Sequence, residues 1–333
     1  EMVNNGNTDG KVFDKDGVMQ FAEKYFEDLK LDKTSDDFGR PANKWNVKKE
    51  EVGTYANTPD ATFTKKVTKA DVYNAIGKTV YDDLKDGDAT LTTYFDGDGT
   101  KVKAADVDST WANKNDTGKV NSTGNGDLTE IYVDDDTNDV TIVTVRTYVF
   151  QAASDYDTRK ETVSLTTDSS KYDTDITLDS RTLDVDDFAN ITDLKADDYV
   201  LVTAVNNNSR YEVKSIDKAE VVNGTVEGYK DGSNVTMGGT KYEYSATADN
   251  IKKTSYNVGR EASLVLDSYG YVIKVDVSKA SSDYAYVVNT GADEGRYDDE
   301  SSYYAKLLLA DGTVVEAELD EDCLTGNDFA NKK

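Results

Sequence analysis

The run from Asp197 to Ala219 constrains the fold more than any other part of the chain. Its first half is apolar on both faces of an extended strand, because successive side chains point to opposite sides: Tyr199, Leu201 and Thr203 to one, and Val200, Val202 and Ala204 to the other. Asparagines then interrupt the run at 206–208, and asparagine tolerates the left-handed backbone of turns. The second half alternates, with Tyr211, Val213 and Ser215 on one face and Glu212, Lys214 and Ile216 on the other. The stretch predicts two strands joined by a turn, the second with one solvated face.

The same arrangement of short strands and polar turns recurs after Gly126. A hairpin is predicted over 128–133 and 140–145, around an acidic turn. Further strands are predicted at 148–152, 161–165, 221–226, 234–244, 262–277, 284–288 and 304–319. Units of roughly 60 to 70 residues with about five short strands are typical of small closed barrels or sandwiches. We therefore predict a mainly-β fold of tandem small β-barrel or sandwich units with a short N-terminal helical segment.

The predicted boundaries are 1–38 for an N-terminal loop and helix, 39–125 for a mixed α+β module with a linker, and 126–196, 197–259 and 260–333 for the β units. An apolar stripe through Phe21, Tyr25 and Leu29 predicts a helix within Asn4–Lys30. The module is predicted to contain a linker at 36–45, strands at 50–55 and 61–67, a helix at 68–76 between caps Thr68 and Gly77, an Asp-Gly turn within 95–100, and a long loop at 108–127.

One segment has the spacing of a calcium-binding loop. Oxygen-bearing side chains and a glycine fall at positions 1, 3, 5, 6 and 12 of an EF-hand-like loop followed by a helix: Asn5, Asn7, Asp9, Gly10 and Asp16. Asparagine at the first position and aspartate in place of the last glutamate depart from that pattern. The arrangement resembles half of a dockerin module, without a second copy. The candidate metal ligands are Asn5, Asn7, Asp9 and Asp16, for Ca²⁺. The alternative is an Asn/Gly-rich loop in which Asp16 caps the helix.

Charge and composition exclude several classes of function. The formal net charge is −27, from 65 acidic and 38 basic residues, and such a field repels phosphate backbones and anionic lipid. No apolar run approaches the roughly 20 residues of a membrane span. We therefore expect neither nucleic-acid binding nor membrane insertion. Cys323 is the single cysteine, so no internal disulfide forms. The opening Glu1-Met2 suggests a mature product or a fragment.

Catalysis is not expected either. Histidine is absent, which removes Ser-His-Asp and Cys-His mechanisms and the common zinc sites. A glycosidase needs only two facing carboxylates, but no pair is marked by a motif. The acidic runs at 134–136, 186–187 and 298–300 fall where solvated turns are expected. The aromatic residues, including Trp45 and Trp111, leave a glycan-binding surface open, although tyrosine in a lean β protein more often packs across strands.

The order of the N-terminal segments resembles a known family. The run from Asp36 to Trp45, with Gly39-Arg40-Pro41, is followed by 50–55 and by Val67 to Gly77, and this order is similar to a segment of S-layer-homology (SLH) domain proteins. The later hairpins, including 199–202 and 308–314, look like the β-rich region that follows the SLH modules in these bacterial surface proteins. No SLH module itself is recognised, so wall anchoring is assigned to no residue. The family supplies no catalytic residues.

The resemblance implies a non-catalytic structural module of an exported bacterial cell-surface (S-layer-like) protein, acting as a spacer or assembly unit. Its expected location is extracellular, at the bacterial surface. Its expected partners are other copies, other surface proteins or glycans, with acidic loops bridged by Ca²⁺. The alternative is an adhesin module that binds glycans or host proteins, which a cleft with two or more solvent-exposed aromatic rings would favour.

Overall fold

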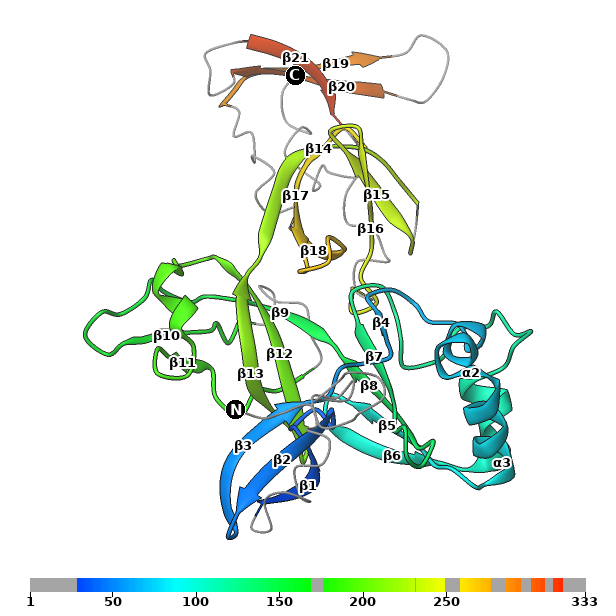
Figure 1. Ribbon diagram of the computed structural model, residues 1–333. Coiled ribbons are helices and arrows are strands. Elements are labelled where there is room, and N and C mark those ends of the chain that lie inside the picture. Colours follow the sequence, from blue (N-terminus) through cyan, green and yellow to red (C-terminus); the bar gives the residue numbers. More distant parts are fainter. Residues whose placement is uncertain are drawn as a thin grey trace. The chain divides into compact units, whose positions relative to one another are not determined.

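The computed structural model describes residues 29–168, 176–230, 232–248, 258–276, 286–294, 301–308 and 314–319. These residues are mainly β, as predicted, and form several separate sheets (Figure 1). The chain divides into two compact units, Glu1–Val277 and Ser278–Lys333. The predicted calcium loop and most of the predicted N-terminal helix lie outside the described residues. The last two residues of that helix, Leu29 and Lys30, begin a strand instead.

A five-stranded sheet in the order β4-β7-β8-β5-β6 lies beside the main helix of the first unit (Figure 1). The strands are β4 (Ala61–Phe63), β5 (Leu91–Phe95), β6 (Asp98–Val102), β7 (Leu128–Val133) and β8 (Val140–Val145). β5 runs parallel to β8 and the other pairs are antiparallel. The helix α2 (Lys69–Asp86) buries Val72, Ile76, Val80 and Leu84 in one core with Leu91, Ile131 and Ile142. A short helix α3 (Ala104–Asp106) and a π-helical turn η1 (Val107–Trp111) open the predicted 108–127 loop.

The start of α2 is the predicted capping box. Thr68 accepts a hydrogen bond from the backbone of Asp71, whose carboxylate accepts one from the backbone of Thr68. Gly77 interrupts the helix with φ 78° and ψ 168°, but a second helical segment follows and ends at Gly87, which has φ 84°. The predicted helix therefore does end at Gly77, and what the sequence did not predict is the second helical segment up to Asp86. The apolar stripe continues through Val80 and Leu84, and its burial compensates for the break.

Strand β12 (Tyr199–Asn207) packs on two cores, as its two apolar faces predict. It lies between β13 (Arg210–Lys218) and β9 (Thr147–Gln151). Val200, Val202 and Ala204 form one face, which packs in a core with Phe150 and Ile191. Tyr199 and Leu201 form the other face, which packs in a core with Val149, Val265 and Ile273. The strand therefore connects the β9 region to β17 (Glu261–Leu266) and β18 (Val272–Asp276).

The face predicted for Ile216 is wrong. A bulge between Thr203 and Ala204 leaves Lys214 without an opposite residue on β12. An extra residue reverses the side-chain alternation beyond it. Ile216 therefore turns into the core with Tyr211 and Val213, where it is 4% exposed.

The remaining described elements of the first unit form smaller sheets around these. One sheet contains β1 (Leu29–Ser35), β2 (Pro41–Val47) and β3 (Glu50–Ala56), and another contains β10 (Thr162–Ser164) and β11 (Thr182–Asp184), with the 3₁₀ helix η3 (Ala189–Asp193) following β11. The predicted linker at 36–45 is wrong beyond residue 40, because β2 buries Ala42 and Trp45 and begins with a proline, a position that strands tolerate. The second unit contains β19 (Tyr286–Glu294), β20 (Ser301–Leu308) and β21 (Val314–Leu319).

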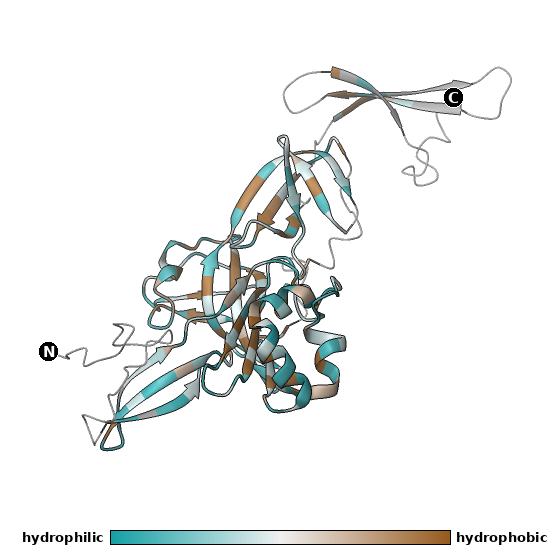
Figure 2. Cartoon of the chain, turned by 45° about the vertical axis from the view of Figure 1, so that its right-hand side comes forward, coloured by the Kyte–Doolittle hydropathy of each residue, from teal (hydrophilic) through white to brown (hydrophobic). Residues whose placement is uncertain are grey.

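The described strands form open sheets rather than the predicted closed barrels. The sheet nearest to closure has the strand order β16-β15-β14-β17-β18. Its strands are β14 (Glu220–Lys230), β15 (Asn234–Met237), β16 (Thr240–Glu243), β17 (Glu261–Leu266) and β18 (Val272–Asp276). β14 pairs with β17 along its first half and with β15 along its second half. The two outer edges meet only at one bridge, Tyr244–Val272, because β16 ends at Glu243. Hydrophobic and hydrophilic segments alternate along the strands (Figure 2).

Candidate functional site

The most deeply buried charged groups of the first unit lie where three of its sheets approach one another. They are Asp96, Asp127 and Asp267, which are 0%, 0% and 5% exposed, and we call them the acid cluster. Asp96 lies in the turn between β5 and β6, Asp127 precedes β7, and Asp267 follows β17. A charged group is rarely buried without a partner, so each position needs a physical account.

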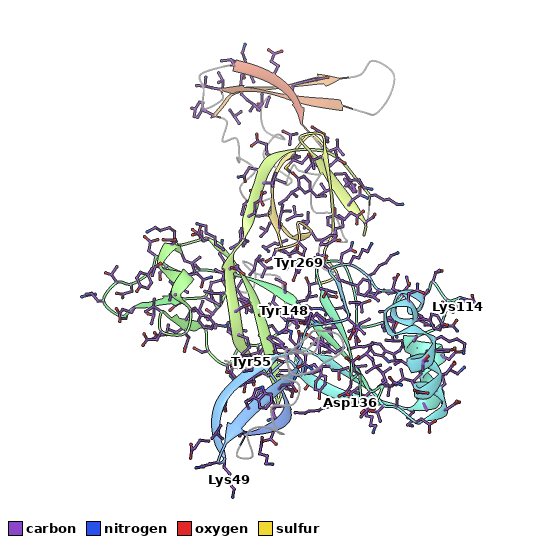
Figure 3. All side chains as sticks on the ribbon, viewed as in Figure 1. Lys49, Tyr55, Lys114, Asp136, Tyr148 and Tyr269 are labelled. Atoms are coloured by element: carbon purple, nitrogen blue, oxygen red, sulfur yellow. The ribbon has the colours of Figure 1, made fainter. Side chains whose placement is uncertain are left out.

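Asp96 connects its hairpin to two other strands. It forms a tight two-residue turn with Gly97, as the Asp-Gly pair predicts, with φ 46° and 88°. Its Oδ1 accepts a hydrogen bond from the Arg146 backbone at 2.9 Å, and its Oδ2 accepts one from the Tyr148 hydroxyl at 2.6 Å. Its own carbonyl accepts one from the backbone of Asn206 on β12 at 2.8 Å. The turn between β5 and β6 is thus hydrogen-bonded to β9, through Tyr148 (Figure 3), and to β12, through Asn206.

Asp127 is paired with the guanidinium of Arg146. The Arg146 Nε donates to Asp127 Oδ1 at 3.2 Å, and the guanidinium carbon lies 4.7 Å from the centre of the Phe95 ring. This pair holds the segment before β7 against the connection between β8 and β9. The second carboxylate oxygen of Asp127 has no hydrogen-bond partner among the described residues.

Asp267 organises the turn between β17 and β18. Its Oδ1 accepts hydrogen bonds from the backbones of Tyr269 and Tyr271, both at 2.9 Å. This Asx arrangement fixes the turn, in which Gly270 has φ 83°. The Asp267 Oδ2, like that of Asp127, has no hydrogen-bond partner in the described part of the chain.

Burial changes the acidity of the cluster. Loss of solvation raises the pKa of Asp96 to about 6 and that of Asp267 to about 6, and it also raises the pKa of Asp127. Hydrogen bonds from Tyr148 and the Arg146 backbone act in the opposite direction on the pKa of Asp96. The negative charge of Asp127 also raises the pKa of both other members.

This predicts a pH dependence of stability that Asp96 carries. A carboxyl whose pKa is raised on folding binds more protons folded than unfolded, so its contribution is full below the unfolded pKa, near 4, and is lost as pH rises through about 6. The free energy of unfolding should therefore increase as pH falls from 7.5 to 5, by about 1.4 kcal/mol from Asp96, toward a full contribution of about 3 kcal/mol below pH 4. Urea unfolding of the wild type and Asp96→Asn at several pH values measures it. An identical pH slope in both proteins would contradict the assignment.

The described structure also has open cavities, and two of them are lined by residues outside the acid cluster. One, of about 410 Å³, lies between the β1–β3 sheet and β7–β8 and includes Tyr94, Tyr132 and Asp134. The other, of about 460 Å³, includes Phe38, Arg40, Lys214 and Tyr269. The buried carboxyls therefore do not line either of these cavities.

The sequence-predicted ligands Asn5, Asn7, Asp9 and Asp16 lie outside the described residues. The acidic loop at 134–139 forms a turn in which Asp134 Oδ1 accepts from the backbones of Asp136 and Thr137, with Asp136 exposed (Figure 3). Within the described ranges no group of three or more His, Cys, Asp or Glu is placed to hold a metal ion. No helix among the described residues is long and apolar enough to cross a membrane.

The sequence did not predict the acid cluster, because it placed Asp96 in a turn within 95–100, Asp127 at the end of the 108–127 loop and Asp267 in the strand 262–277, with no contact between them. The signal that was present is tyrosine. Two buried tyrosines donate their hydroxyls to aspartates of distant segments, Tyr148 to Asp96 and Tyr199 to Asp276, the latter at 2.7 Å. A tyrosine in an apolar strand needs a partner for its hydroxyl, and aspartate is the abundant acceptor here.

These features define a buried polar junction rather than an open active site. Comparison of the chain with protein-family models, with curated proteins and with solved structures finds no match.

Proposed function

We propose that this chain is a non-catalytic structural module of an exported bacterial cell-surface (S-layer-like) protein, acting as a spacer or assembly unit. The observation that carries the proposal is the joining of separate sheets by side chains buried between them. Asp96, Arg146 and Tyr148 tie the five-stranded sheet to the β9–β12–β13 sheet. Such contacts resist relative movement of the sheets, which is what a spacer requires.

Further contacts across sheets support the same role. The Tyr199 hydroxyl joins β12 to Asp276 on β18, and Lys214 on β13 reaches Asp37 beside β2 at 2.6 Å. Arg40 and Lys33 pair with Glu130 and Asp134 of the five-stranded sheet. Exposed ion pairs alone stabilise little, so the buried hydrogen bonds and the shared core around β12 dominate.

The surface supports an extracellular role through its charge. The net charge of −27 keeps such a module soluble and suits an exterior that divalent cations bridge. The adhesin alternative requires two exposed aromatic rings in one cleft. In the larger cavity Tyr269 is 40% exposed and Phe38 is 8% exposed, and in the smaller one Tyr94 is half-buried and Tyr132 is 5% exposed. The spacer is therefore the better supported function.

Hydrogen exchange of the full chain tests the spacer. We expect the amides of β9, β12 and β17 to be the slowest and to open together as urea is added, because they share one core. Tyr199→Phe, which keeps the ring and removes the hydroxyl, should weaken the protection of β12 and β18 together. Independent opening of β17 at much lower urea than β12 would show a hinge and overturn the spacer. Saturable binding on a glycan array would favour the adhesin.

A further inference from the structure

Two buried carboxylates present unpartnered oxygens beside the same turn. The side chain of Asp127 is fully buried and Asp267 is 5% exposed. The Oδ2 atom of each has no hydrogen-bond partner among the described residues. Buried polar atoms are paired in nearly all folded proteins, because an unpaired one retains the cost of losing water. These two oxygens therefore call for a ligand.

Both carboxylates border the glycines of one turn. Gly124 to Asp127 form a turn closed by a backbone hydrogen bond of 3.2 Å, and Gly126 has φ 82°. A β-carbon on Gly126 would lie 2.1 Å from Asp267 Oδ2 and 2.9 Å from the hydroxyl oxygen of Ser245. A β-carbon on Gly124 would lie 3.0 Å from Asp127 Oδ2. Oxygens from three segments thus border one turn, over backbone that only glycine leaves bare.

The charge of this region is unbalanced. Arg146 contacts Asp127 at 3.2 Å, and Lys119 acts on Asp127 from an exposed position. Against these stand three buried carboxyls, Asp96, Asp127 and Asp267. An additional positive charge between Asp127 and Asp267 would neutralise the excess and supply both unpartnered oxygens at once.

We propose that Asp127 Oδ2, Asp267 Oδ2 and the Ser245 hydroxyl bind a divalent cation of the calcium type. The cation joins the 124–127 turn to the turn between β17 and β18, and so locks two sheets together. An all-oxygen ligand set suits a hard cation, whereas zinc and copper prefer nitrogen and sulfur. With two carboxylates and otherwise neutral oxygens, the affinity falls in the millimolar range of extracellular calcium modules.

Thermal unfolding of the full chain tests the site, at pH 7.5 and constant ionic strength, in 10 mM calcium and in chelator. Calcium should raise the Tm of the wild type by about 3 °C. Asp267→Asn, which keeps the Oδ1 acceptor of the turn, should lose this rise. In chelator the variant should be at least as stable as the wild type, because it removes buried charge. Asp127→Asn should also lose the calcium-dependent rise in Tm. Asp136→Asn, which lies on an exposed turn, should keep that rise.

Terbium is a second probe. Tyr269 and Tyr271 follow Asp267 closely in the chain, and their rings can sensitise the luminescence of a terbium ion bound there. Sensitised emission that Asp267→Asn abolishes supports the site. A calcium response that Asp267→Asn retains and Asp9→Asn removes would overturn it in favour of the N-terminal loop. A wild type whose Tm is the same in calcium and in chelator would also overturn it.

Discussion

Replacing Asp96 by alanine should lower the free energy of unfolding by about 3 kcal/mol. The change removes the acceptor of the Tyr148 hydroxyl at 2.6 Å and of the Arg146 backbone at 2.9 Å, both inside the molecule. Each buried donor left without an acceptor costs about 1–3 kcal/mol. Alanine also disfavours the φ of 46° at this position by about 1 kcal/mol. Urea denaturation at pH 7.5, followed by circular dichroism, measures the loss.

The matched control is Asp96→Asn. Asparagine keeps an acceptor for the Arg146 backbone, offers its amide to the Tyr148 oxygen and tolerates a positive φ. It also removes the buried carboxylate of Asp96, whose pKa is raised by burial. We expect its stability at pH 7.5 to lie within about 1 kcal/mol of the wild type. If asparagine and alanine were equally destabilising, the carboxylate charge rather than the hydrogen bonds would hold the junction.

Local patterns predicted most of the elements, because short strands and turns are encoded by neighbouring residues. The alternation around 199–216, the hairpin at 128–145 and the capping box of Thr68 and Asp71 depend only on side chains close in sequence. Their periods and turn residues were therefore sufficient. The double-faced burial of β12 also followed from sequence, because a strand apolar on both sides can be satisfied only between two cores.

Features that depend on distant residues were not predicted. Asp96 was placed correctly in a turn, but its burial depends on Tyr148, which lies 52 residues later. Nothing beside Asp96 in sequence distinguishes it from the exposed Asp98 two residues on. The pairing of β14 with β17 and of β9 with β12 likewise crosses the predicted unit boundaries at 259/260 and 196/197. Strand partners are set by the assembled core, so a pattern of strands does not reveal whether a sheet closes.

The inward turn of Ile216 shows the same limit at one position. Alternation placed it beside Glu212 and Lys214, on the solvated face. The single-residue bulge at Lys214 reverses the alternation, so Ile216 joins the core instead. The bulge is defined by the pairing of β13 with β12, and a period-two pattern within one strand does not contain that pairing.

Gly97→Ala should destabilise the first unit by about 3 kcal/mol, because Gly97 is crowded as well as left-handed. Its φ is 88°. A β-carbon there would lie 2.6 Å from the Val205 side chain on β12 and 2.7 Å from the backbone carbonyl oxygen of Asp37. The valine methyl can shift, but a backbone oxygen yields only if the 36–40 turn moves. The substitution therefore pushes the turn between β5 and β6 away from Val205 on β12 and from the 36–40 turn.

Gly87→Ala separates the two causes. Gly87 ends α2 with φ 84°, close to that of Gly97, and no described atom lies within 4 Å of its added β-carbon. Alanine there should lower the free energy of unfolding only through the left-handed backbone, by about 1 kcal/mol. The excess loss at Gly97, about 2 kcal/mol in urea unfolding, measures the contact between the hairpin, β12 and the Asp37 turn. Equal losses at the two glycines would mean that the tip moves aside freely, and the rigid joining of sheets that the proposed spacer needs would lose its support at this contact.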